Sequence, residues 1–454
     1  MKVSVKVSGA SLTPPSFSSY RDVASHPTPM LRLLVLFAVM AATAVAQTSP
    51  LHALIDRHAG EVNAQVIAWR RDIHQHPELS GEEVRTAKLV EQALVQMGIE
   101  VRAQVGGHGV VGVLRGARPG PTVALRADMD ALPVTEATTL PFKSTVRTTF
   151  RGQDVGVMHA CGHDAHVAML LGAASVLSRM RDRLPGTVVF IFQPSEEAPP
   201  GGALAMIDAG VLDAPKVDAI FGLHVFPGEV GRLEYREGPI MASADNYRIT
   251  IHGKQTHGAR PWDGTDPVVI GAQVVTALQT LVSRQTDLTL TPAIVTVGAF
   301  NGGVRENIIP DSAVLIGTIR TFDRTVRTQL HERLTRTAMK IAEASGARAE
   351  VSIVPGYPVT LNDSAVVRRM VPSLERVSPG KVGIAKLSMP AEDFSRYLEK
   401  VPGMFVFLNV TGPGTDHAAA PANHSPLFDV DERALPVGVR TLASLAADYL
   451  SGVR

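Results

Sequence analysis

Apolar residues recur every three to four positions in several long stretches, and short, continuously apolar runs lie between these stretches. The first spacing is typical of helices that bury one face, and the second of buried strands. A capping box, Ser80–Glu83, predicts the start of a helix that ends near Met97. The other early helices are predicted over 51–73 and 163–180, and strands over 110–114, 122–126, 187–192 and 217–225. This alternation predicts an α/β fold around a largely parallel sheet.

The order of predicted strands and helices changes after Gly238. Strands are predicted over 247–252, 293–300, 313–321 and 349–354, and helices over 267–284 and 324–344. The resulting β-α-β-β-α-β order is that of a ferredoxin-like domain. A strand over 404–409 and a helix over 431–450 then resume the first pattern. We therefore predict a discontinuous catalytic domain of residues 47–239 and 355–454, with a smaller α+β domain of residues 240–354 inserted into it.

The N-terminal segment 1–46 has the features of an extension followed by a signal peptide. Met30-Leu-Arg32 precedes an apolar run over 33–42, and Ala44-Val-Ala46 fits a cleavage site. An N-terminal membrane anchor is the alternative, but the run is short for a span, so we expect no stable membrane span after processing. The prediction is export to the periplasm or the exterior, with the working start at Met30.

Charge and cysteine content narrow the possible functions. Lys and Arg number 44 against 43 Asp and Glu, so the balance does not predict nucleic acid or a charged membrane surface as a partner. Cys161 is the only cysteine, and His159, His163 and His166 surround it. An unpaired thiol in an exported protein is prone to oxidation unless a bound metal holds it as thiolate. Cys161 and His163 are therefore candidate metal ligands.

Further candidates lie at the ends of predicted strands, where open α/β sheets place their sites. Glu196 and Glu197 follow strand 187–192, Asp128 follows strand 122–126, His224 lies within strand 217–225, and His424 lies in a late loop. Each has an ordinary alternative: a buried cysteine, a core histidine, a solvated glutamate turn, an exposed loop histidine. Together, one cysteine, three histidines and a glutamate form a ligand set for two metal ions, with one carboxylate left over.

Four motifs resemble the dinuclear metallopeptidase family of aminoacylases and carboxypeptidases, in particular hippurate hydrolases and auxin-conjugate (IAA-amino acid) hydrolases. The motifs are His159–Asp164, Arg126–Pro133, Phe192–Glu197 and His257–Pro261. The resemblance implies a zinc-peptidase-like catalytic domain, with Cys161, His163, Glu197, His224 and His424 as ligands and the thiolate between two ions. It also implies that Glu196 is the general base and that Asp128 orients the site.

For the inserted domain, the resemblance implies dimerisation and lid functions. His257 would reach the active site of the partner in a homodimer. Asn301, Asn307 and Arg320 would hold the carboxylate of the substrate, as suits a guanidinium; a surface salt bridge is the alternative for Arg320. The chain departs from the family pattern at 302–306 and 389–394, both expected near the substrate pocket.

The sequence thus predicts a metal-dependent amidohydrolase whose small-molecule substrates are N-acyl or N-aroyl amino acids, such as hippurate. Glu196 would accept a proton from a metal-activated water and pass it to the leaving amine. A carboxypeptidase or dipeptidase with the same site is the first alternative, and a non-catalytic binding protein is the second. Thiolate and imidazole ligands favour zinc, while manganese, cobalt and nickel remain alternatives.

Overall fold

The computed structural model describes residues 50–417 and 419–452. The predicted extension and signal peptide of residues 1–46 lie outside the described residues. Within the described part of the chain, no helix is long and apolar enough to cross a membrane.

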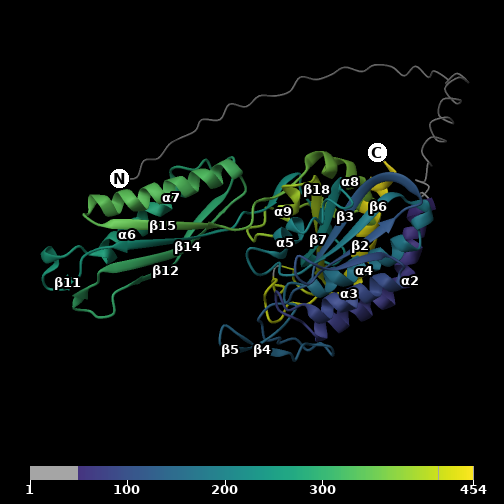
Figure 1. The fold of residues 1–454 in the computed structure, drawn as a ribbon, viewed down its shortest axis with the longest axis horizontal. Helices are drawn as coiled ribbons and strands as arrows, with labels where there is room; N and C mark the ends of the chain where they lie inside the picture. Colours follow the sequence, from purple (N-terminus) through teal and green to yellow (C-terminus); the bar gives the residue numbers. More distant parts are fainter. Residues whose placement is uncertain (1–49, 418, 453–454) are drawn as a thin grey trace, which may run out of the picture. The chain divides into compact units, whose positions relative to one another are not determined.

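One mixed sheet of eight strands forms the centre of the larger domain (Figure 1). Its four inner strands, β6, β3, β7 and β18, run parallel, and antiparallel pairs join β1 to β2, β2 to β6 and β8 to β18. In sheet order, the strands are β1 (Glu100–Val105), β2 (Gly109–Arg115), β6 (Pro185–Gln193), β3 (Arg118–Asp128), β7 (Ala219–Glu229), β18 (Gly403–Thr411), β8 (Leu233–Tyr235) and β17 (Val382–Ile384). The inner strands are nearly continuously buried, as strands covered on both faces must be.

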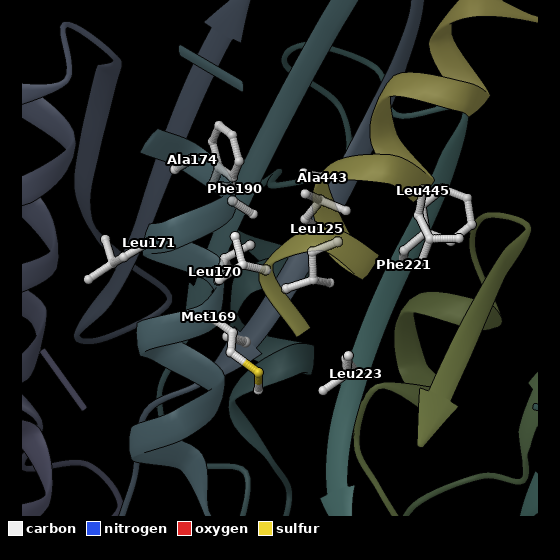
Figure 2. Close-up of a cluster of buried hydrophobic side chains, with 14 of the residues drawn as sticks. Leu125, Met169, Leu170, Leu171, Ala174, Phe190, Phe221, Leu223, Ala443 and Leu445 are labelled. Atoms are coloured by element: carbon white, nitrogen blue, oxygen red, sulfur yellow. The ribbon is translucent and has the colours of Figure 1, made fainter. Parts of the chain in front are cut away.

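Helices cover both faces of this sheet and form two separate cores. On one face pack α2 (Pro50–Gln75), α3 (Val84–Gln96), α4 (His163–Ser178), α8 (Ser364–Val377) and α10 (Leu435–Ser451). On the other face pack α5 (Gly202–Asp208) and α9 (Ser395–Leu398). Figure 2 shows Leu170 of α4 next to Leu125 of β3, and Phe221 of β7 next to Leu445 of α10, within the first of these cores. All but the last residue of α4 are buried, because α2 and α10 cover the helix on its outer side.

The inserted domain has the predicted ferredoxin-like order (Figure 1, teal to green). Its antiparallel sheet runs β12 (Ala293–Gly302), β14 (Ser312–Thr321), β10 (Asp245–His252), β15 (Arg348–Pro355). Alternate residues of these strands pack against α6 (Pro267–Ser283) and α7 (Arg324–Ala344), so only one face is buried. The predicted fold class, a mixed but mostly parallel α/β sheet with a separate α+β insert, is confirmed. The domain boundaries at 239/240 and 354/355 stay predictions.

Short elements account for most of the differences from the prediction. Three small pairs were not anticipated: β4 (Arg147–Phe150) with β5 (Gln153–Gly156), β9 (Gly238–Met241) with β16 (Thr360–Asn362), and β11 (Thr256–His257) with β13 (Ile308–Ile309). The last predicted helix begins as a 3-10 turn, Glu432–Ala434, before α10. Strands of two to four residues are too short to show a hydrophobic period.

The prediction that Ser80–Glu83 forms a capping box is wrong. Helix α3 begins at Val84, with Glu83 at its N-cap position and no side-chain cap hydrogen bond. The Ser80 hydroxyl donates instead to Asp130 at 2.6 Å, and the Glu83 carboxylate accepts from the backbone N–H of Ser195 at 2.8 Å. Tertiary partners have displaced the local cap.

Candidate active site

The predicted site residues of the catalytic domain lie at neighbouring strand ends. Glu196 and Glu197 follow β6, Asp128 is the last residue of β3, and His224 lies in β7. Because β6, β3 and β7 are adjacent and parallel, their carboxyl ends meet at one edge of the sheet. His424 joins them from the loop that follows β18.

Cys161 and His163 stand at the start of α4, on either side of Gly162. This glycine has a left-handed φ of 86°. A Cβ at its position would lie 2.4 Å from Cγ2 of Val225, so no other residue fits between the two candidate ligands. The close approach of β7 to this turn brings the motif against His224.

The five predicted ligands meet in two groups that share the Cys161 thiol. His163 and His224 complete one group, and Glu197 and His424 complete the other. Within each group, one potential ligand atom per residue lies within 4.8 Å of the others. Cys161 Sγ is 3.5 Å from Nε2 of His224, and Nε2 of His424 is 3.2 Å from Oε1 of Glu197. Such a grouping would place one thiolate between two cations.

Hydrogen bonds leave the ring nitrogens that face these groups free to bind a metal. Nδ1 of His163 donates to the carbonyl of Asp130 at 2.8 Å, and Nδ1 of His224 donates to the carbonyl of Val225 at 2.9 Å. In the neutral form of each ring, Nε2 is then the unprotonated acceptor, as metal binding requires. Among the described residues, the buried Nε2 of His163 has no hydrogen-bond partner, and Oε1 of Glu197 has only ion-pair contacts with His424 at 3.2 Å and His163 at 3.9 Å. Buried acceptors without partners are costly, so the donor set fits a cation.

A surplus of buried negative charge surrounds both groups. Burial by itself lowers the pKa of His163, but the carboxylates of Asp128 and Asp130 raise it to about 10. Burial raises the pKa of the Cys161 thiol well above its usual range, and the carboxylates of Glu197 and Glu196 raise it further. Divalent cations would neutralise this charge and hold the thiol as thiolate.

In a third grouping, of Asp128, His163 and His166, hydrogen bonds already engage the Asp128 carboxylate and both ring nitrogens of His166. Nδ1 of His166 donates to Asp128 at 2.6 Å, and Nε2 of the same ring accepts from the backbone N–H of Val225 at 2.9 Å. His166 therefore holds Asp128 in place and ties it to the strand that carries His224.

The carboxylate of Glu196 is the one predicted catalytic group that hydrogen bonds leave free. The residue is buried, and within the described part of the chain its carboxylate forms no hydrogen bond. Burial, followed by the charges of Glu392 and Glu197, raises the pKa of Glu196 well above its usual range. A carboxylate with a raised pKa is a stronger base, as proton transfer from water requires.

The backbone around Glu196 is fixed by residues to which the sequence analysis assigned no function. The Asp130 carboxylate accepts from the backbone N–H of Glu196 at 3.0 Å and of Glu197 at 2.9 Å. The Tyr357 hydroxyl donates to the carbonyl of Glu196 at 2.5 Å. Asp130 belongs to the motif that starts at Arg126, so its position after a predicted strand could have identified it from the sequence. No sequence pattern marks Tyr357.

A cavity of about 600 Å³ opens onto these groups. Cys161, Glu196, Glu197, His224 and His424 line it, together with apolar side chains from both domains, among them Pro199, Phe226, Met241 and Val354. The altered segment at Pro390–Glu392 lines it too, as expected.

Arg320 also lines this cavity. Its guanidinium donates to the Thr318 hydroxyl and to the carbonyl of Ile319, and it forms no ion pair with a described carboxylate. The alternative of a surface salt bridge is therefore wrong. Burial lowers the pKa of Arg320, which nevertheless stays charged at neutral pH.

The structure does not bring His257, Asn301 and Asn307 to this cavity. His257 lies on β11, which pairs with β13, and all three side chains are exposed. The altered segment 302–306 lines a separate cavity of about 700 Å³ in the inserted domain. For this segment, the expected position near the substrate pocket is wrong within one chain, because the inserted domain lines that pocket with Asn246, Arg320 and Val354 and not with the separate β11–β13 pair.

A mostly parallel α/β sheet with an antiparallel insert, and a candidate metal centre at its strand ends, fits a metal-dependent hydrolase. The chain belongs to the peptidase family M20/M25/M40, whose family model matches residues 124–448. It is accordingly a hydrolase that acts on amide bonds. The resemblance seen in the four motifs is confirmed.

Several curated relatives share about two fifths of their residues with this chain. Thermostable carboxypeptidase 1 of Saccharolobus solfataricus is 42% identical, over 86% of this chain and 96% of the relative. N-acetyl-L-cysteine deacetylase of Bacillus subtilis is 41% identical, over 82% and 85%. IAA-amino acid hydrolase ILR1-like 4 of Arabidopsis thaliana is 40% identical, over 85% and 86%. A solved structure from Bacillus subtilis, the YXEP protein, described as a dinuclear metal binding peptidase, superimposes with a TM-score of 0.74 at 37% identity, covering 87% of this chain and all of that one.

Proposed function

We propose that this chain is a metal-dependent amidohydrolase that cleaves the amide bond of N-acyl and N-aroyl amino acids. One observation carries the proposal. The Glu196 carboxylate, free of hydrogen bonds, lies in the same cavity as two ligand groups that share the Cys161 thiol. A site that only bound its ligand would have no use for a buried base in that position.

The residues of the chain divide the chemistry among them. Cys161, His163, Glu197, His224 and His424 would hold two divalent cations, which when bound polarise the amide carbonyl and make water a better nucleophile. Glu196 takes a proton from the attacking water and returns it to the leaving nitrogen. Asp130 and Tyr357 keep the Glu196 backbone in place during both transfers.

The lining of the cavity supports an acylated substrate. Pro199, Phe226 and Met241 provide an apolar wall for an acyl or aroyl group. Arg320 provides a guanidinium without an ion-pair partner among the described residues for the carboxylate of the amino acid. A dipeptide would need an acidic partner for its free amino group. Glu392 lines the cavity, but it is already paired with Arg126 at 3.0 Å.

A carboxypeptidase is the second candidate, because thermostable carboxypeptidase 1 is 42% identical over 86% of this chain. The N-acetyl-L-cysteine deacetylase favours the first candidate. Rates on hippurate, N-acetyl amino acids and free dipeptides, measured with one metal-loaded preparation, separate the two. The proposal also includes zinc as the bound metal and a homodimer as the assembly. It further includes export through a signal peptide that ends before Gln47.

The test is the Glu196→Gln variant, which keeps the shape of the side chain and removes the base. We expect at least about a 100-fold loss of kcat on hippurate, the usual contribution of general-base catalysis. Bound metal, measured by elemental analysis, should stay at the wild-type content because Glu196 is not in either group that shares Cys161. Full activity in this variant would refute the assigned base, and a loss of metal would make Glu196 a ligand.

A further inference from the structure

Arg320 is not the only guanidinium in the cavity. Arg396, on α9 of the catalytic domain, lines the same cavity as Arg320, on β14 of the inserted domain. Arg396 donates to the carbonyl of Gly356 at 2.9 Å, which anchors one edge of its guanidinium. Its Nε is buried without a hydrogen-bond partner in the described chain, and its nearest ion-pair contact is Glu399 at 3.8 Å.

The carboxylates that line the cavity have other partners or functions. Glu197 belongs to a proposed ligand group, Glu196 is the proposed base, and Glu392 is held by Arg126. Glu399 does not line the cavity, and it also pairs with Arg324 at 3.3 Å. The cavity therefore presents two cationic side chains, whereas the single carboxylate of an N-acyl glycine would occupy one of them.

We propose that the preferred amino-acid half of the substrate carries a second carboxylate, as in an N-acylated glutamate or aspartate, and that Arg396 binds it. The inference rests on the proposed function and names its substrate class. Arginine suits the purpose because its charge is permanent and its planar donors match a carboxylate. In the alternative binding mode, Arg320 and Arg396 would both bind the α-carboxylate of the substrate, and no second carboxylate would be needed.

The two arrangements differ in how they treat isosteric substrates. N-benzoylglutamate and N-benzoylglutamine have nearly the same shape and differ in the charge of the side chain. We expect the metal-loaded wild-type enzyme to favour the glutamate over the glutamine compound by at least about tenfold in kcat/KM, the worth of one charged hydrogen bond. The Arg396→Gln variant should reduce this ratio to near one.

Arg324→Gln is the matched control, because Arg324 contacts the same Glu399 but does not line the cavity. The control should retain the wild-type ratio. A wild-type ratio near one, or an equal loss on benzoylglutamate, benzoylglutamine and hippurate in the Arg396 variant, would overturn the inference. If the wild-type enzyme hydrolyses hippurate but has a glutamate-to-glutamine ratio near one, this inference fails and the proposed function stands. No hydrolysis of any of the three by metal-loaded enzyme would overturn the proposed function, and the inference with it.

Discussion

Arg126 is a fully buried cation surrounded by acidic side chains. Its guanidinium contacts Asp128 at 2.6 Å, Asp393 at 2.7 Å and Glu392 at 3.0 Å, and Nε donates to Gln193 at 2.9 Å. Burial lowers the pKa of Arg126, but these three carboxylates raise it well above its usual range. One cation thus offsets part of the negative charge of Asp128, Glu392 and Asp393 beside the active site.

Replacing Arg126 with methionine should destabilise the protein severely. The change leaves buried carboxylates without a counter-charge, which costs about 3–5 kcal/mol of unfolding free energy. Urea unfolding of the wild type and the Arg126→Met variant measures this loss of unfolding free energy. Arg115→Met is the control, because Arg115 pairs with Glu100 at 3.5 Å on the surface and should cost less than about 1 kcal/mol. Similar losses in the two variants would show that the buried network is not what stabilises this region.

At the scale of elements, Asp245 joins β10 and α7 of the inserted domain to Gly356, which follows the predicted end of that domain. It is the first residue of β10, and its buried carboxylate accepts from Arg327 at 2.9 Å and His331 at 2.8 Å on α7, and from the backbone N–H of Gly356 at 3.0 Å. Burial raises the pKa of Asp245, but hydrogen bonds from Arg327 and His331 lower it to about 2. Arg320, on the adjacent strand, is the other cation that interacts with it.

This contact predicts a stability change at acid pH. Because folding lowers the pKa of Asp245, its contribution is present above about pH 4 and is lost as pH falls toward 2. The stability difference between wild type and Asp245→Asn should therefore be larger at about pH 6 than at about pH 3. Urea midpoints at both pH values measure the difference. A difference that stays constant would mean that the ionised carboxylate contributes nothing specific.

At the scale of the whole molecule, the inserted domain exposes residues that one chain does not use. His257 is exposed on β11, away from the residues that line the Glu196 cavity. Trp262 follows it closely in the chain, Ile308 lies opposite it on β13, and Val304 precedes Ile308. All three are exposed apolar side chains. Exposed apolar residues grouped in this way are typical of a protein interface. They support the proposed homodimer, in which His257 would act in the site of the partner.

Mixing two inactive variants tests the shared site. His257→Ala and Glu196→Gln should each lose most activity alone. After subunit exchange at equal amounts, activity should return to roughly a quarter of wild type, because half the dimers are mixed and each holds one intact site. The recovered activity is measured as the rate of hippurate hydrolysis before and after subunit exchange. Two stable dimers that exchange subunits without regaining activity would place His257 outside the partner's site.

The sequence by itself determined the order of the long elements and the residues of the proposed metal centre. Long helices and buried strands have clear periods, and parallel strands share one carboxyl edge, so Glu196, His224 and Asp128 could be placed together before any coordinates. Only the tertiary structure decided which side chains are partners. Ser80 and Glu83 follow a local capping rule yet bond to Asp130 and Ser195, and Arg126 pairs with Asp393, 267 residues away. Burial makes those distant hydrogen bonds worth more than local ones, and the sequence pattern carries no record of which residues folding brings together.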